Sequence, residues 1–176
     1  MELFAAAGWR TMQTDAIARG FLERDASVHA ALRQRWGDVV INAVGVVDRQ
    51  AIAARVFTDS EELEWLESLL HPMVRSAWQQ ALAAEPDANW LVEIPLLFEK
   101  RLESAFDLTV CVICPSDVVE TRMLSRGYSK AQVEQRQLRQ MPLEQKAKLA
   151  DRVITNAGSL EFLKRQTYLL IEDSVN

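Results

Sequence analysis

The sequence predicts an α/β protein, with a doubly wound, mostly parallel sheet and helices on both faces. Three short runs rich in apolar and β-branched residues are typical of buried parallel strands, and segments with apolar residues at helical spacing separate them. A shorter apolar run near the N-terminus indicates a fourth strand. The expected strands cover residues 11–14, 90–94, 108–113 and 152–155.

Helices fill most of the remaining length. We expect Ser60 to begin a long helix, because Glu61 and Glu62 follow it and acidic residues favour a helix N-terminus. Pro72 predicts either a kink or a break in that helix. We expect residues 1–8 to be the last part of a helix. The other expected helices cover, in chain order, 16–24, 28–36, 49–57, 60–82, 116–123, 129–141, 142–150 and the segment from 159 onward.

Length and composition favour a single domain. The chain has 176 residues, of which 49% are hydrophobic and 26% charged, enough for one sizeable core. We expect residues 16–88 to form a helical insertion over the strand ends and residues 116–141 to form a lid. No run suits a membrane span or a signal peptide, so we expect a cytoplasmic protein. The net charge of −5 argues against broad nucleic-acid binding.

The two cysteines, Cys111 and Cys114, form a C-x-x-C pattern that can indicate a redox pair. We expect two small core residues instead, because both fall in one apolar run where a spacing of three places side chains on opposite sheet faces. The sequence offers no second pair of Cys or His to complete a zinc site. We therefore predict no protein-built metal site.

Two acidic residues follow predicted strands. Glu93 ends an apolar run that Pro95 cuts off, so a buried Glu93 would need a compensating cation, metal or hydrogen-bond donor. Alternatively, the strand surfaces early and leaves Glu93 solvated. Asp15 follows the first strand and either caps the next helix or orients a bound hydroxyl group. Such sheets bind ligands at the carboxyl ends of their strands.

Arginines cluster on two consecutive predicted helices. Arg122 and Arg126 lie four residues apart, and Arg136 and Arg139 follow on the next helix. Such a helix pair resembles a mobile lid that closes over phosphates, and the alternative is an ordinary solvated face. His71, in a leucine-rich run, is either a satisfied core residue or part of a site.

Six short motifs follow one another along the chain. They are Asp15-Ala-Ile-Ala-Arg19, Leu69-Leu70-His71-Pro72, Pro95-Leu-Leu-Phe-Glu99, Arg122-x-x-x-Arg126, Arg136-x-x-x-Gln140-Met-Pro-Leu-Glu-x-Lys146 and Ala150-Asp-x-Val-Ile-x-Asn156-x-Gly158. In these residues, from about position 2 to position 165, the chain resembles the dephospho-coenzyme A kinases. The resemblance implies a P-loop kinase fold and the last step of coenzyme A synthesis. In that reaction ATP, with Mg²⁺, phosphorylates the ribose 3′-hydroxyl of dephospho-CoA.

The resemblance also implies roles for individual residues. Asp15 matches the acid that activates the acceptor hydroxyl, and Arg122 matches the lid arginine that stabilises the transferring phosphoryl group. The implied acceptor side comprises His71, Glu93, Pro95, Leu96, Leu97, Phe98 and Glu99. The implied nucleotide side comprises Arg126, Arg136, Asn156, Ala157 and Gly158.

Two departures from the family pattern stand out. Gln13-Thr-Asp15 replaces the frequent Asp-x-Asp, and the chain has no Gly-Lys dipeptide, hence no Gly-x-x-x-x-Gly-Lys-Ser/Thr loop to cradle phosphates. We therefore interpret the chain as an N-terminally truncated P-loop kinase, inactive or severely impaired as residues 1–176. The alternatives are a non-catalytic remnant that binds a CoA-like ligand or a partner protein, and another small-metabolite kinase of the same fold.

Overall fold

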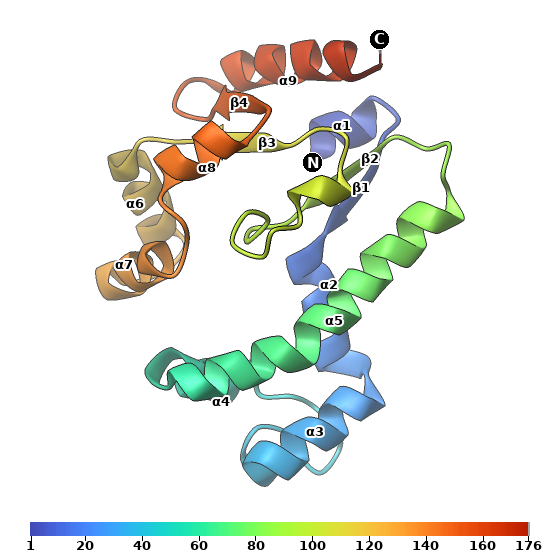
Figure 1. Cartoon of the computed structure of the whole chain (residues 1–176). Helices are drawn as coiled ribbons and strands as arrows, with labels where there is room; N and C mark the ends of the chain where they lie inside the picture. Colours follow the sequence, from blue (N-terminus) through green and yellow to red (C-terminus); the bar gives the residue numbers. More distant parts are fainter. Residues whose placement is uncertain (176) are drawn as a thin grey trace. The chain divides into compact units, whose positions relative to one another are not determined.

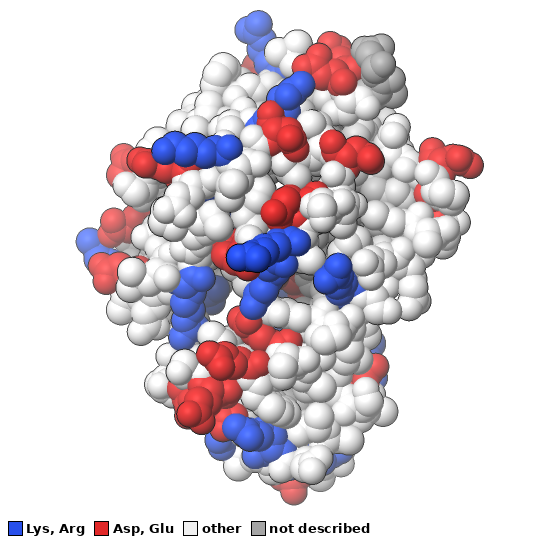
Figure 2. Space-filling view, viewed as in Figure 1, with Lys and Arg blue, Asp and Glu red and all other residues white. Residues whose placement is uncertain are grey.

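A computed structural model describes residues 1–175, and the chain divides into two compact units (Figure 1). The central unit comprises Trp9–Ile94. The terminal unit combines Met1–Gly8 with Pro95–Asn176, of which residue 176 lies outside the described part. None of the described helices is both long and apolar enough to cross a membrane. On the face seen in Figure 2, acidic and basic side chains are interspersed.

The central unit is built on two parallel strands, β1 (Arg10–Gln13) and β2 (Trp90–Glu93). Their register pairs Arg10 with Trp90 and Gln13 with Glu93, so both strands end at the same edge. The connection between them is helical, as the sequence predicts. It contains α2 (Thr14–Arg24), α3 (Ala26–Trp36), the short 3₁₀ helix η1 (Gly37–Val39), α4 (Arg49–Thr58) and α5 (Ser60–Ala84).

The core of the central unit lies among α3, α4 and α5 rather than on the sheet. Its buried side chains are Val28, Leu32, Trp36, Val40, Ile52, Val56, Leu66 and Leu70. The rings of Trp36 and Trp65 meet edge to face, with centroids 4.8 Å apart. Glu62 Oε2 accepts a hydrogen bond from Trp36 Nε1 at 2.7 Å and pairs with Arg35 at 3.0 Å. Hydrogen bonds from Arg35 and then Trp36 hold the pKa of the Glu62 carboxyl below its usual value.

Aspartates begin three of these helices. The side chains of Asp25, Asp48 and Asp59 accept backbone N–H groups of the first turns of α3, α4 and α5. The long helix begins at Ser60 as predicted, and Asp59 is its N-cap residue. α5 continues through Pro72 from Ser60 to Ala84, so the predicted break is wrong. Pro72 cannot donate a backbone hydrogen bond within the helix. Packing of α5 against α2 and α4 stabilises the helix at this position.

The terminal unit is built on a second parallel pair, β3 (Val110–Ile113) and β4 (Arg152–Thr155). Helix α9 contacts β4 and also α1, and α8 contacts β3 (Figure 1). Asp151 joins the starts of both strands, because its Oδ2 accepts the Thr109 hydroxyl at 2.6 Å and the Thr109 N–H at 2.8 Å. The helices of this unit are α1 (Glu2–Ala6), the 3₁₀ helix η2 (Glu103–Ala105), α6 (Ser116–Ser125), α7 (Lys130–Leu138), α8 (Leu143–Leu149) and α9 (Leu160–Val175).

The α/β class and the parallel pairing of all four expected strands are confirmed. Among residues 1–175 the strands form two separate pairs, β1 with β2 and β3 with β4, where the sequence predicts one sheet. The boundary of the units falls between Ile94 and Pro95, directly after β2. A proline suits this point, because it lacks the N–H that a continuing strand would donate.

The core of the central unit yields a stability prediction. Leu32→Ala should lower the free energy of unfolding by about 2–5 kcal/mol, because Leu32 is fully buried and the smaller side chain leaves a cavity. Val44→Ala, at an 83% exposed position, is the control and should stay within about 0.5 kcal/mol. Urea titration followed by tryptophan fluorescence measures this, since all five tryptophans lie within Trp9–Ile94. Equal losses in both variants would contradict the core described above.

Candidate active site

Polar side chains gather where β1 and β2 end. Gln13 Nε2 donates to Glu93 Oε2 at 2.7 Å, and Thr14 Oγ1 donates to the Glu93 carbonyl at 3.1 Å. The Glu93 side chain is exposed, so the reading in which the strand surfaces early is correct and the buried-carboxylate reading is wrong. In-register pairing of Gln13 with Glu93 brings the two side chains together across the strand pair.

Asp15 lies in the first turn of α2, directly beyond this edge. Gln13 is the N-cap residue, so the alternative in which Asp15 caps the helix is wrong. A carboxylate in the first turn is stabilised by the positive end of the helix dipole. The Asp15 side chain is exposed and makes no hydrogen bond or ion pair with another residue of the described chain. It is therefore available to a ligand hydroxyl or cation.

His71 lies near the middle of α5, one residue before Pro72. Its side chain is 44% exposed, and its Nδ1 lies 3.9 Å from Glu67 Oε2, one helical turn earlier. The alternative of a satisfied core histidine is therefore wrong. An exposed imidazole beside a carboxylate can bind a polar group, and the role that the resemblance implies for His71 stays a prediction.

Arg122 is held at the carboxyl ends of β3 and β4. Its Nη1 donates to the Asn156 carbonyl at 3.0 Å and lies 3.7 Å from Cys114 Sγ. Cys114 Sγ also donates to that carbonyl at 3.3 Å, and the Asn156 N–H donates to the Ile113 carbonyl at 2.8 Å. The Arg122 guanidinium and the predicted nucleotide loop are therefore joined directly, a contact that the sequence does not reveal.

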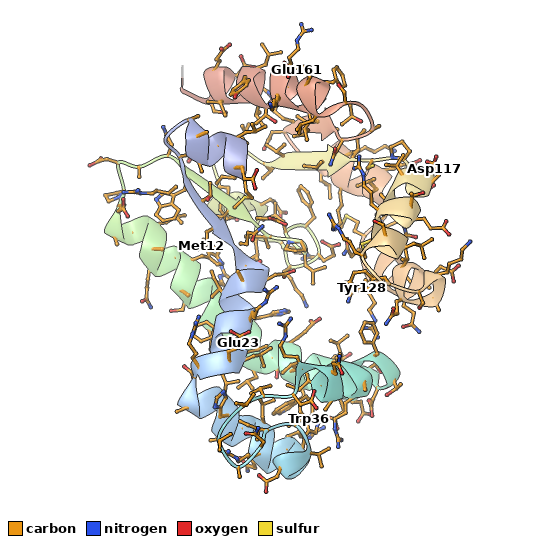
Figure 3. The ribbon with its side chains drawn as sticks, turned by 180° about the vertical axis from the view of Figure 1, so that it is seen from behind. Met12, Glu23, Trp36, Asp117, Tyr128 and Glu161 are labelled. Atoms are coloured by element: carbon orange, nitrogen blue, oxygen red, sulfur yellow. The ribbon has the colours of Figure 1, made fainter. Side chains whose placement is uncertain are left out.

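The α6–α7 segment (residues 116–141) carries the other predicted lid residues. Arg126 caps the C-terminus of α6, is exposed, and has no side-chain partner among residues 1–175. Tyr128, labelled in Figure 3, lies in the turn between the two helices. The Arg136 guanidinium lies over the Tyr128 ring, 4.8 Å from its centroid. Glu120 pairs with Lys130 at 2.9 Å and so ties α6 to α7.

The Pro95–Glu99 segment turns back on itself instead of extending β2. Phe98 is buried, and Leu102 N–H donates to the Leu97 carbonyl at 3.0 Å. Glu99 Oε1 pairs with Lys146 Nζ at 2.8 Å, so this carboxylate is engaged within the protein. Lys146 belongs to one of the sequence motifs, yet sequence reasoning gave it no role. Its burial, unusual for lysine, is visible only in the structure.

The described residues contain no cluster of three His, Cys, Asp or Glu side chains able to hold a metal ion. Mg²⁺ differs from most protein-bound metals, since it keeps several waters and needs only one or two carboxylates when phosphates also bind it. The free carboxylate of Asp15 fits that requirement, while Gln13 beside it carries no charge.

The features of the two units fit a kinase-type α/β phosphotransferase. An available carboxylate follows one parallel strand pair, and a helix pair rich in arginine follows the other. A family model described as dephospho-CoA kinase matches residues 1–161. The chain belongs to the dephospho-CoA kinase family.

Individual relatives agree. A dephospho-CoA kinase of Anaeromyxobacter dehalogenans is 35% identical over 175 residues, which cover 97% of this chain and 83% of that protein. The enzyme of Thermosynechococcus vestitus is 35% identical over 88% of this chain and 77% of its own length. A solved Thermus thermophilus protein superposes with a TM-score of 0.80 at 32% identity, over 98% of this chain and 88% of that one. A Campylobacter jejuni dephospho-CoA kinase shares the fold, with a TM-score of 0.68 at 24% identity over the same shares.

The two cysteines, of which Cys114 lies beside Arg122, allow a chemical test. Cys111 is buried within β3, whereas Cys114 follows the strand and is half-buried, so only Cys111 lies inside the strand as predicted. Burial raises the pKa of the Cys111 thiol, which lowers its thiolate fraction. A short iodoacetamide pulse on the folded chain should therefore modify Cys114 about tenfold faster or more, as read by peptide mass spectrometry. Urea should equalise the two rates, and a disulfide between them after mild oxidation would contradict the strand geometry.

Proposed function

We propose that this chain carries the residues for transfer of the γ-phosphate of ATP to the ribose 3′-hydroxyl of dephospho-CoA, in the cytoplasm. The observation that carries the proposal is the family match over residues 1–161, which spans both units. In this reaction the 3′-oxygen attacks the γ-phosphorus, and the bond to the leaving ADP oxygen breaks. The protein has to take up the hydroxyl proton and stabilise the charge on the transferring group.

The central unit would supply the group that receives the proton. Asp15 is exposed, follows β1 and has no competing partner in the described chain. Its carboxylate can accept a hydrogen bond from the 3′-hydroxyl and then its proton, as a general base does. His71 and Glu93, which belong to the same unit, are the further acceptor-side residues that we propose, and both are exposed.

The terminal unit would supply the positive charge. One nitrogen of Arg122 is fixed by the Asn156 carbonyl, and the remaining N–H donors of its guanidinium can bind phosphoryl oxygens. Arg126 would add a second cation to the nucleotide phosphates. Arg136 stacks on Tyr128 and thereby supports the turn that carries Arg126. Asn156, Ala157 and Gly158 follow β4 and would line the adenine side.

The proposed acceptor segment Pro95–Glu99 has a mixed character. Phe98 is buried and Glu99 is paired with Lys146, so these two side chains shape the segment from within. Pro95, Leu96 and Leu97 are half-buried and offer the apolar surface that would meet the acceptor. We therefore propose that Pro95, Leu96 and Leu97 contact the acceptor, and that Phe98 and Glu99 hold the segment in its conformation.

Mg²⁺ is the metal that we propose to accompany ATP. It would neutralise the charge of the phosphates and bind mainly through them, which leaves Asp15 for the acceptor hydroxyl. Because Gln13 replaces an acid, we expect the phosphates and water to supply most of its ligands.

The absence of a Gly-Lys phosphate loop from the sequence predicts weak turnover. Purified residues 1–176 should form CoA from ATP, Mg²⁺ and dephospho-CoA at least about a thousandfold more slowly than the Anaeromyxobacter dehalogenans enzyme, the scale expected when a phosphate-stabilising group is missing. Mass spectrometry of CoA over several hours measures so low a rate. Turnover close to that of the relative would refute this prediction. Binding of dephospho-CoA without any turnover would favour the non-catalytic alternative.

Asp15→Asn tests the proposed base. In an active form of the protein that is extended by a phosphate loop, it should lower the rate of CoA formation by about 10²–10⁴-fold. The ATP dissociation constant should stay within about twofold, because a base acts on the acceptor. Glu161→Gln is the matched control, since Glu161 is also an exposed acid in the first turn of a helix, α9. Equal losses of rate and ATP affinity in Asp15→Asn would instead assign Asp15 to the metal or the nucleotide.

A further inference from the structure

A buried ion pair joins three segments of the terminal unit that are far apart in the sequence. Lys146, on α8, is 9% exposed, and the Glu99 side chain is 16% exposed. Lys146 Nζ lies 2.8 Å from Glu99 Oε1 and donates to the Pro95 carbonyl at 3.0 Å and to Gln140 Oε1 at 3.2 Å. Glu99 Oε1 also accepts the backbone N–H of Met141 at 2.7 Å.

In this pair the ammonium group makes all the hydrogen bonds it can donate, whereas one oxygen of the carboxylate accepts none. An ammonium group has three donors, and here all three have acceptors. Glu99 Oε2, by contrast, is buried and without a hydrogen-bond partner in the described chain. Burial raises the pKa of the Glu99 carboxyl, but the Lys146 ammonium and the Met141 N–H lower it by more, so Glu99 remains ionised.

Stability alone does not account for such a pair. Replacing a buried ion pair by apolar residues of similar size is often neutral or stabilising, whereas removing one partner is strongly destabilising. The pair instead holds one connecting segment of the chain in position. Gln140 and Met141 form the connection between α7 and α8, which is the C-terminal root of the α6–α7 segment. Glu99 and Lys146 each hold one residue of that root.

We propose that Glu99 and Lys146 are positioning residues that anchor the C-terminal root of the α6–α7 segment to the loop after β2. The anchor sets where the segment presents Arg122, Arg126 and Arg136, which rests on the proposed function of those arginines. Glu99 thereby acts on the reaction through the segment rather than through the acceptor. The other end of the segment has its own attachment, from Arg122 to the Asn156 carbonyl.

Amide hydrogen exchange on the full ligand-free chain tests the anchor with three variants. Lys146→Met removes the ammonium. Glu99→Leu combined with Lys146→Met removes both charges. Glu120→Gln removes the exposed Glu120–Lys130 pair within the same segment and is the control. The deciding quantity is the exchange rate of the amides of residues 130–141 relative to those of β3 and β4. The urea midpoint is a separate measure of global stability.

Lys146→Met should lower the urea midpoint and raise the relative exchange rate of residues 130–141 about tenfold or more, the scale of a lost hydrogen bond to a charged group. The double variant should recover the midpoint of the parent chain at least in part, yet keep the raised relative exchange rate, because the anchor is still missing. Glu120→Gln should change neither quantity beyond about twofold.

Two outcomes would overturn the anchor. One is that residues 130–141 of the double variant exchange as slowly as in the parent chain. The other is a uniform rise across β3, β4 and α7, which is what general loss of stability produces. Because no substrate is present, the measurement does not depend on turnover. A chain without kinase activity would therefore still leave this test decisive.

Discussion

Parallel pairing of strands is the constraint on which the rest of this structure depends. Two parallel strands end at the same edge, so whatever follows them in sequence becomes adjacent in space. In the central unit this edge brings Gln13 and Glu93 together, with Asp15 in the first turn of the helix that follows. In the terminal unit it brings the residues after Ile113 and Thr155 together, and Arg122 reaches the Asn156 carbonyl there. Each candidate site is therefore a consequence of strand direction.

The charged groups of the two units differ in whether other residues of the protein bind them. This difference distinguishes structural residues from candidate binding or catalytic residues. Glu93, Glu99 and Lys146 are engaged by protein partners at 2.7–2.8 Å. Asp15 and Arg126 have none among residues 1–175, and each lies at the end of a helix in its own unit. A charge that the protein leaves unpaired at low cost must be exposed, and both are. Exposure and lack of a partner leave these two groups available for substrates.

The sequence predicted what depends on local pattern. The β4 strand and the start of α7 at Ser129, whose hydroxyl and Gln132 form a capping box, follow from residue types within a few positions. The family followed from motifs in order. The division into two strand pairs, the exposure of Glu93 and the uninterrupted α5 could not be predicted, because they depend on packing and pairing between distant residues. The Glu99–Lys146 pair is of the same kind, since 47 positions separate its partners and neither residue type is usually buried.

The attachment of Arg122 supports the proposal that this residue, rather than Arg126, meets the reacting phosphoryl group. Freezing a long side chain costs up to about 2 kcal/mol of rotamer entropy. The Arg122 side chain is already ordered before a ligand binds, because the Asn156 carbonyl and Cys114 hold its Nη1. The other N–H groups of the guanidinium fork stay free. A phosphoryl group that meets an ordered fork gains the full benefit of a bidentate contact. Arg126, exposed and untethered, must be ordered by its ligand, so it contributes attraction more than precise placement. Because the same carbonyl belongs to the loop proposed to meet adenine, binding of the nucleotide base and placement of Arg122 are physically linked.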